Sequence, residues 1–142
     1  MTDLYFCGTF RTDWSRQFNF ELEKRFTSKG LSCFLPQRDS DQSGDRKLTF
    51  EEDVAGIDGA DCVVAIGAVM QSANWGFEVG YCYGKKKPVV ALTDKENPLD
   101  LMTEGAIEHI LVVKNLDQID SYFDGLFSIV AQNLPQVAEV AG

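Results

Sequence analysis

Five short apolar segments alternate along this 142-residue chain with segments of helical character, and no hairpin turn joins two of the apolar segments. The apolar segments, each of strand length, are residues 3–8, 31–35, 62–66, 88–92 and 110–113. Strands that are separated by helices form parallel sheets with right-handed crossover connections. The alternation therefore predicts an α/β fold: a doubly wound, flavodoxin-like five-stranded parallel sheet with helices on both faces.

Apolar residues that recur every three or four positions mark the helices between these strands. The first predicted helix ends at Gly30, and its apolar stripe consists of Trp14, Phe18, Leu22 and Phe26. A second helix, closed by Gly84, follows the third strand, and a short one begins near Pro98. A continuous final helix is predicted from the apolar positions between 119 and 130.

The polar segment 37–47 has no periodicity, and we expect a loop there. Its charged side chains either line a ligand pocket or are solvated, and solvation is expected for most of them; they are Arg38, Asp39, Asp41, Asp45 and Arg46. Thr49 and Glu52 then have the spacing of a capping box, in which each side chain bonds the backbone N–H of the other residue. This spacing predicts a helix that runs to about Gly59 and carries Asp53 in its first turns.

The charge balance restricts the ligands of the protein. Thirteen basic residues against 22 acidic ones give a net charge of −9. Such a charge disfavours a nucleic-acid polymer or an anionic membrane as partner, and favours a small neutral or cationic ligand. The length is that of one domain, which we take to span residues 1–142.

The cysteines indicate the compartment. Cys7, Cys33, Cys62 and Cys82 show no CxxC spacing, and three of them lie in apolar, strand-like segments. Buried free thiols in a reducing compartment are therefore expected in place of disulfides or a zinc site. The sequence shows neither a signal peptide nor an apolar run of membrane length, so we expect a cytoplasmic protein.

Several common chemistries lack their motifs here. No GxGxxG motif follows the first strand and no GxxxxGK[ST] motif is present, which argues against dinucleotide-binding and P-loop sites. The single histidine, His109, adjoins the fifth strand, which argues against a histidine-based triad or metal site. Carboxylates remain as the groups that can carry chemistry.

Glu78 is the carboxylate with the most informative position. It follows the apolar run 62–66 and a polar loop, so it lies on a helix just past the carboxyl end of a central strand, where open α/β sheets bind ligands. Asp53 and Tyr5 map to the same edge of the sheet. Two carboxyl groups about 5 Å apart suit a retaining attack on a glycosidic carbon. Taken singly, Glu78 and Asp53 also fit surface carboxylates near helix starts, and Tyr5 fits a half-buried strand tyrosine.

The joint pattern resembles the nucleoside 2-deoxyribosyltransferase family. The resemblance rests on residues 5–8 (YFCG), on Asp53 followed by 59–65 (GADCVVA), on 76–81 (GFEVGY), and on Gly84-Lys85 with 98–102 (PLDLM). It implies that Glu78 is the nucleophile, that Tyr5 positions it, and that Asp53 handles the proton of the departing and arriving base. It also implies that Phe10, after the first strand at Gly8, stacks on the base.

Two departures from the transferase pattern affect the expected substrate. Ser72 stands where the transferases usually have aspartate, and with Thr9 and Arg11 it resembles the related nucleoside 5′-monophosphate N-glycosidases, in which the serine helps to hold the phosphate. Asp100 stands where the transferases have asparagine, at a position that in the family reaches across a subunit interface toward the sugar 5′ end. A carboxylate facing a phosphate costs about 1 to 4 kcal/mol at 4 Å. We therefore favour a nucleoside over a nucleotide.

The resulting hypothesis is a 2′-deoxyribosyl transfer between nucleobases of deoxynucleosides through a covalent intermediate on Glu78. This chemistry needs no metal and no organic cofactor. Asp100 and Met102 are expected to complete a neighbour's pocket, so the active species is expected to be a homo-oligomer, a dimer or a hexamer. Hydrolysis of a 5′-monophosphate is the first alternative. A nucleoside- or nucleotide-sensing module without turnover is the second, because flavodoxin-like domains serve many roles.

Overall fold

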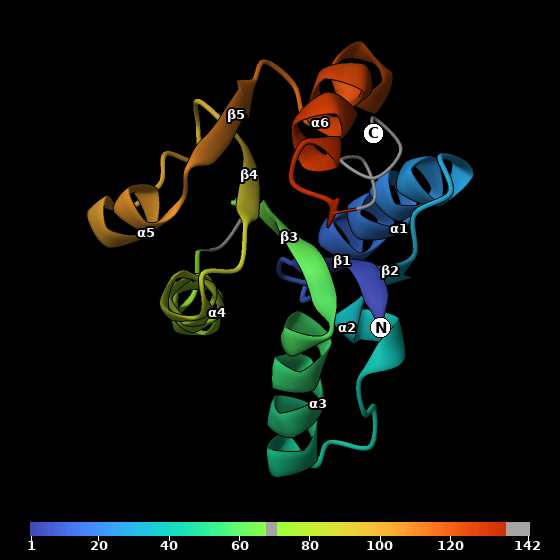
Figure 1. The fold of residues 1–142 in the computed structure, drawn as a ribbon, viewed down its shortest axis with the longest axis vertical. Helices are drawn as coiled ribbons and strands as arrows, with labels where there is room; N and C mark the ends of the chain where they lie inside the picture. Colours follow the sequence, from blue (N-terminus) through green and yellow to red (C-terminus); the bar gives the residue numbers. More distant parts are fainter. Residues whose placement is uncertain (68–70, 136–142) are drawn as a thin grey trace.

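Five parallel strands form one sheet in the computed structural model, which describes residues 1–67 and 71–135. The strands are β1 (Thr2–Cys7), β2 (Cys33–Phe34), β3 (Ala60–Ile66), β4 (Val89–Asp94) and β5 (His109–Val113). Their order across the sheet is β2-β1-β3-β4-β5, and every neighbouring pair is parallel (Figure 1). This is the flavodoxin-like order, so the predicted fold class is confirmed. Residues 68–70 and 136–142 of the predicted domain lie outside the described part.

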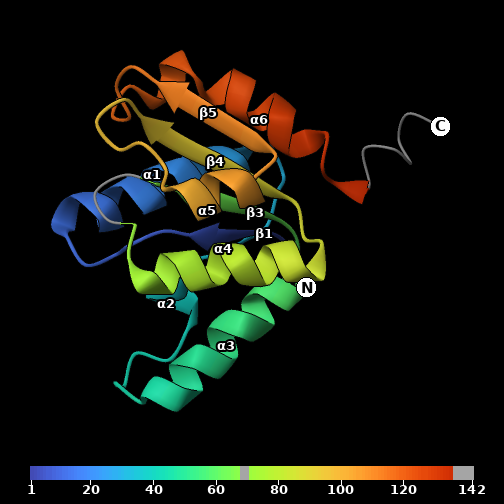
Figure 2. The ribbon, with the colours of Figure 1, turned by 90° about the vertical axis from the view of Figure 1, so that its left-hand side faces the viewer.

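Helices cover both faces of the sheet, and the alternation of side chains along β1 shows how (Figures 1 and 2). Leu4 and Phe6 pack with α1 (Asp13–Ser28) and α6 (Phe123–Ala131) in one core cluster. Tyr5 and Cys7 point to the opposite face and pack with residues of α3 (Arg46–Asp58) and α4 (Ala73–Lys85) in a second cluster. A short helix, α5 (Leu101–Ala106), lies beside α4. The strands are therefore buried on both sides, as parallel sheets require.

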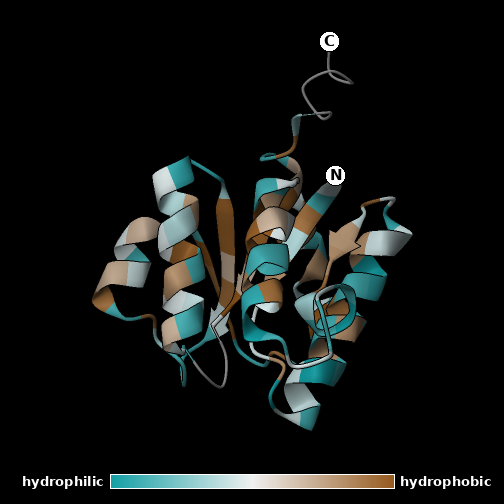
Figure 3. Cartoon of the chain, turned by 90° about the horizontal axis from the view of Figure 1, so that it is seen from below, coloured by the Kyte–Doolittle hydropathy of each residue, from teal (hydrophilic) through white to brown (hydrophobic). Residues whose placement is uncertain are grey.

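Hydropathy follows the same layering. In Figure 3 the strands carry hydrophobic colours and lie between helices that are largely hydrophilic on their outer sides. The four cysteines, all in the described part, are buried free thiols, as the sequence predicts. Within residues 1–67 and 71–135, no helix has the length and apolar character that a bilayer crossing demands.

The start of α3 corrects the sequence prediction. The helix begins at Arg46, because the carboxylate of Asp45 accepts a hydrogen bond from the backbone N–H of Leu48 at 3.0 Å. The predicted capping box at Thr49 is wrong: this residue lies inside the first turn, and its hydroxyl donates to the carbonyl of Asp45 at 2.8 Å. Asp53 consequently lies two turns into the helix, not at its start.

The segment before α3 is also more ordered than predicted. It contains α2 (Pro36–Asp39), a single helical turn that Pro36 begins. The carboxylate of Asp39, left open between a pocket position and a solvated one, accepts a hydrogen bond from the backbone N–H of Leu35 at 2.9 Å and pairs with Arg38 at 2.8 Å. The predicted loop 37–47 is therefore wrong at both of its ends.

Three further boundaries differ from the prediction. Helix α4 continues past Gly84 to Lys85 and ends at Lys86, which adopts a left-handed φ of 59°. The predicted final helix is interrupted: a 3₁₀ turn, η1 (Ile119–Ser121), precedes α6. Strand β2 has two residues, fewer than the five predicted.

Candidate active site

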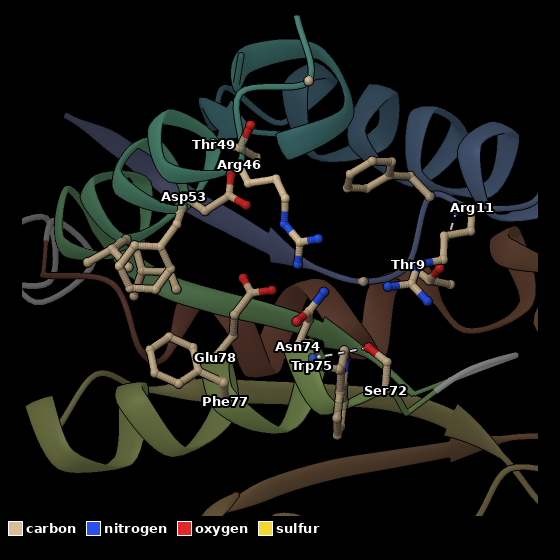
Figure 4. Close-up of a pocket in the computed structure, with 16 residues that line it drawn as sticks. Thr9, Arg11, Arg46, Thr49, Asp53, Ser72, Asn74, Trp75, Phe77 and Glu78 are labelled. Carbon is tan, nitrogen blue, oxygen red and sulfur yellow. Dashed lines mark hydrogen bonds between the residues drawn. The ribbon is translucent and has the colours of Figure 1, made fainter. Parts of the chain in front are cut away.

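A pocket of about 640 Å³ opens at the carboxyl ends of β1 and β3, where the connections that follow these two strands run in opposite directions along the sheet. From β1 the chain crosses to β2 at one edge, and from β3 it crosses to β4 on the other side. The carboxyl ends of β1 and β3 thus lie beside each other with a crevice above them, the place where doubly wound sheets bind ligands. The residues after β1, one face of α3 and the start of α4 line the pocket (Figure 4). Its volume is in the range of small-molecule sites.

Glu78 projects into this pocket from the second turn of α4 (Figure 4), and Tyr5 on β1 holds its carboxylate. The Tyr5 hydroxyl donates a hydrogen bond of 2.6 Å to Oε2 of Glu78 across 73 positions of sequence. Tyr5 is fully buried, and its ring stacks on Phe34 at a centroid distance of 5.4 Å. A side chain fixed in this way orients the carboxylate and leaves Oε1 free of hydrogen bonds to the described residues.

The protonation of Glu78 is set mainly by its burial. Burial raises the pKa of Glu78 from 4.5 to about 7, the hydrogen bond from Tyr5 opposes this rise, and the charge of Asp53 adds to it. Burial and the neighbouring Glu78 charge raise the pKa of the Tyr5 hydroxyl, which therefore remains a donor. A poorly solvated carboxylate that ionises near neutral pH is well suited to nucleophilic attack.

Asp53 faces the same space from α3 (Figure 4). Burial raises the pKa of Asp53, a hydrogen bond from the Ser40 hydroxyl opposes the rise, and the charge of Glu52 adds to it. Ser40 is itself buried and follows α2 directly. Two carboxyl groups with raised pKa values thus share one pocket, an arrangement typical of acid–base and nucleophilic sites.

The loop after β1 contributes three predicted residues, Gly8, Phe10 and Arg11, which all line the pocket. A Cβ atom at Gly8 would lie 3.3 Å from Cδ1 of Ile66, so the backbone passes close to β3 at this point. Buried Asn19 fastens the loop by donating a hydrogen bond of 3.1 Å to the carbonyl of Thr9.

Ser72, the predicted residue on the α4 side, also lines the pocket and caps the helix. Its hydroxyl oxygen accepts a hydrogen bond from the backbone N–H of Trp75 at 3.3 Å. The Trp75 indole N–H in turn donates to the carbonyl of Cys7 at 3.2 Å, which joins the first turn of α4 to the end of β1.

The protein-family model for nucleoside 2-deoxyribosyltransferases matches residues 4–117. This range contains all the pocket residues. The chain belongs to the nucleoside 2-deoxyribosyltransferase family. A search of curated protein sequences gave no significant match.

Solved structures that share this fold include three proteins, two of which are enzymes. A conserved protein from Enterococcus faecalis V583 superposes with a TM-score of 0.75 at 23% identity, over 94% of this chain and 99% of that chain. The 2-deoxyribosyltransferase of Bacillus psychrosaccharolyticus gives 0.69 at 18% identity, over 84% and 91%. The CMP N-glycosidase of Clostridium botulinum gives 0.60 at 15% identity, over 86% and 98%. At these identities the likeness shows the fold alone.

Three of the residues carried over from the family do not line the pocket of this chain: Tyr5, which reaches it only through its hydrogen bond to Glu78, and Asp100 and Met102. Asp100 precedes α5, and its backbone N–H donates to the side-chain oxygen of Gln71 at 3.2 Å. Met102 lines a separate cavity of about 510 Å³ between α4 and α5. The single chain does not bring these two side chains to Glu78.

Sequence reasoning missed several pocket residues, of which Arg46 is the most important. It was expected to be solvated, but its side chain extends from the first residue of α3 across the pocket (Figure 4). Asn74 and Phe77 on α4 were also missed. The signal for Arg46 was its spacing: residues 46, 49 and 53 share one helix face once Asp45 is recognised as the cap. Among the described residues, no cluster of three or more His, Cys, Asp or Glu side chains has the arrangement of a metal site.

Proposed function

We propose that the protein transfers a 2′-deoxyribosyl group between nucleobases, with Glu78 as the nucleophile. The observation that carries this proposal is the partly buried carboxylate of Glu78, which accepts a hydrogen bond of 2.6 Å from Tyr5 in a pocket that also contains Asp53. Membership of the nucleoside 2-deoxyribosyltransferase family and the shared fold of the Bacillus psychrosaccharolyticus enzyme support the same activity.

The reaction proceeds in two displacements. A carboxylate oxygen of Glu78 attacks C1′ of the deoxynucleoside and forms a glycosyl ester, while the C1′–N bond breaks and its electron pair leaves with the base. Asp53, whose raised pKa lets it keep a proton to higher pH, donates that proton to the departing base. An arriving base then gives its proton to Asp53 and attacks C1′, which frees Glu78. Both steps together exchange one base for another and retain the configuration.

Glu78→Ala tests the nucleophile. The variant is expected to lose base exchange between a deoxynucleoside and a free purine by several orders of magnitude while remaining folded. Glu51→Ala, an exposed glutamate on α3, is the matched control and should leave exchange unchanged. Activity of Glu78→Ala within tenfold of the parent would contradict the assignment.

A 2′-fluoroarabinosyl substrate tests the covalent step directly. The fluorine slows breakdown of the ester, so the sugar should accumulate on Glu78 and be located there by peptide mass spectrometry. A label on another residue, or none, would refute covalent catalysis on this carboxylate.

The proposal includes a homo-oligomer with shared sites. Leu101 and Met102 on α5 are 83% and 81% exposed, which is high for large apolar side chains. If a second copy covers α5 and lends Asp100 to its neighbour, mixing a Glu78→Ala chain with an Asp100→Ala chain should restore part of the activity that each lacks. A fully active monomer in light scattering, or no recovery on mixing, would refute the shared site.

Hydrolysis of a nucleoside 5′-monophosphate is the second candidate, because of one feature of the pocket. Thr9, Arg11 and Ser72 lie together at the end away from Asp53 (Figure 4). The Arg11 guanidinium has no hydrogen-bonding or ionic partner within the described part of the chain, so it is available to a phosphate. The CMP N-glycosidase of Clostridium botulinum has the same fold.

Two substitutions separate the candidates. Asp100→Ser should weaken turnover of deoxyadenosine and improve that of its 5′-monophosphate. Ser72→Asp should exclude the phosphate further while keeping the helix cap, since aspartate caps helices as well as serine does. The measurement is kcat/KM for both substrates in the parent and both variants. A parent that prefers the monophosphate tenfold would establish the hydrolase, and binding without turnover of either substrate would establish a sensing module.

A further inference from the structure

Arg46 is a cationic group in the pocket to which neither the sequence pattern nor the proposed reaction assigns a role. Figure 4 shows its side chain reaching from the start of α3 toward α4, with the guanidinium between Asp53 and Asn74 and facing Glu78. The residue is exposed at the mouth of the pocket. Its guanidinium makes no hydrogen bond or ion pair with any residue of the described ranges, in contrast to Arg16, Arg25 and Arg38, which all do.

Arg46 does not neutralise the charge of either carboxyl group in the pocket. It forms no ion pair with Asp53 or Glu78, and the pKa of Glu78 responds to burial, to the Tyr5 hydrogen bond and to the charge of Asp53. A guanidinium that neutralised these carboxyls would favour their ionised forms, whereas the pKa values of both are raised. The five N–H donors of Arg46 are therefore available to a ligand.

The position of Arg46 identifies the part of the ligand that it meets. The ligand is oriented by the proposed function, on which this inference rests: C1′ of the sugar lies at Glu78, and the 5′ end lies at the Thr9, Arg11 and Ser72 end of the pocket. The base must then extend toward Asp53, where Arg46 and the exposed aromatic side chains Phe50 and Phe77 lie.

We propose that Arg46 determines base specificity by donating two parallel hydrogen bonds to a base that carries a carbonyl oxygen beside an unprotonated ring nitrogen. Hypoxanthine and guanine present O6 and N7 in this way, and cytosine presents O2 and N3. Adenine places an amino donor beside N7, and in thymine both carbonyl groups flank a protonated N3. Arginine forms such paired bonds with guanine O6 and N7 more often than with any other base edge.

The same contact assists the departure of these bases. When the C1′–N bond breaks, its electron pair is delocalised over the ring nitrogens and the carbonyl oxygen of the leaving base. A guanidinium already bonded to that oxygen stabilises the developing negative charge, because the charge-assisted bond becomes stronger as the charge grows. Adenine and thymine gain less from it, so the preference should appear in turnover as well as in binding.

The experiment measures binding and turnover separately. Dissociation constants of deoxyinosine, deoxyadenosine, deoxycytidine and thymidine are determined by calorimetry on the Glu78→Ala background, where the ligands are not consumed. Arg46→Met is then added, and Lys47→Met serves as control because Lys47 is the adjacent cation, 88% exposed and outside the pocket lining. Arg46→Lys keeps the charge and removes the planar pair of donors.

Deoxyinosine or deoxycytidine should bind at least tenfold more tightly than deoxyadenosine and thymidine, and Arg46→Met should remove that preference by a loss of about tenfold to hundredfold confined to the favoured ligands. In chains that keep Glu78, where turnover is measured, Arg46→Lys should retain more turnover than Arg46→Met. It should retain little of the preference, and Lys47→Met should change neither turnover nor preference. Preference for deoxyinosine alone would identify an oxopurine site, and preference for deoxycytidine alone a cytosine site.

Equal binding of the four ligands, binding of none, or a preference that survives Arg46→Met would overturn the inference. Because these constants are measured without turnover, they also separate its failure from that of the proposed reaction. If base exchange is absent but the Arg46-dependent binding preference is intact, only the proposed transferase activity is contradicted.

Discussion

Replacing Glu78 by glutamine is expected to stabilise the folded protein at alkaline pH, although the substitution removes the proposed nucleophile. Burial raises the pKa of Glu78 from 4.5 to about 7, so its ionised form is disfavoured in the folded state. Below pH 4.5 the carboxyl is protonated in both states and costs nothing. Between these two values the folded state holds more protons than the unfolded state, so stability falls as the pH rises. Above pH 7 the full penalty is present.

The size of the effect follows from the same pKa values. A change from 4.5 to about 7, at about 1.4 kcal/mol per pH unit, corresponds to about 3 kcal/mol. Domains of this kind have total stabilities of about 5–15 kcal/mol, so the gain is large enough to measure. Glutamine keeps the shape of the side chain, and its amide oxygen still accepts the Tyr5 hydroxyl, so the comparison isolates the charge.

Urea unfolding followed by circular dichroism from pH 5 to pH 8.5 is the assay. The unfolding free energy of Glu78→Gln minus that of the parent should increase steadily with pH and level off above about pH 8. The exposed control Glu51→Gln should show a difference that does not depend on pH. A Glu78→Gln difference that changes by less than about 1 kcal/mol, or that decreases with pH, would refute the burial argument.

Three other substitutions test single contacts. Tyr5→Phe removes the hydrogen bond that lowers the pKa of Glu78, so the rising limb of kcat/KM should move to higher pH and the rate at neutral pH should fall about tenfold or more. Asp53→Asn should slow base departure about hundredfold in single-turnover kinetics, with the smallest loss for bases that leave most readily. Lys86→Gly should raise the unfolding free energy by about 1 kcal/mol in urea, because φ at this position is 59°.

The fold was predictable because its signals are local and repeated. Buried parallel strands give apolar runs, and helices give stripes, so all five strands were located. The start of α3 was not predictable, because Asp45 and Thr49 both lie at spacings suited to a cap. The chain uses Asp45, since Thr49 can satisfy its hydroxyl inside the helix by bonding the Asp45 carbonyl at 2.8 Å. A local rule cannot choose between two caps four residues apart.

The site could be predicted only in part from the sequence, because it is held by contacts between residues that are far apart along the chain. Strand alternation places Tyr5 on the face that α3 and α4 cover, but its bond to Glu78 joins residues 73 positions apart and was expected only from the family resemblance. The bond from Ser40 to Asp53 depends on the single turn of α2, which the sequence analysis treated as loop. Arg46 was misplaced because the predicted helix began four residues too late, at a cap on Thr49 instead of Asp45.

The described contacts divide the pocket into a fixed part and an adaptable part. The Tyr5 hydroxyl donates a hydrogen bond to Glu78, and the Trp75 indole donates one to the carbonyl of Cys7. These two buried or partly buried contacts join α4 to β1, a strand covered on both faces. Glu78, the proposed nucleophile, therefore moves only if the core moves, which suits a reaction that depends on attack geometry. Arg46 and Phe50, by contrast, are exposed, and their side chains make no hydrogen bond to the described residues. Substitutions at these rim positions can change which base is accepted without moving Glu78, whereas substitutions at Tyr5 or Trp75 must change stability and rate together.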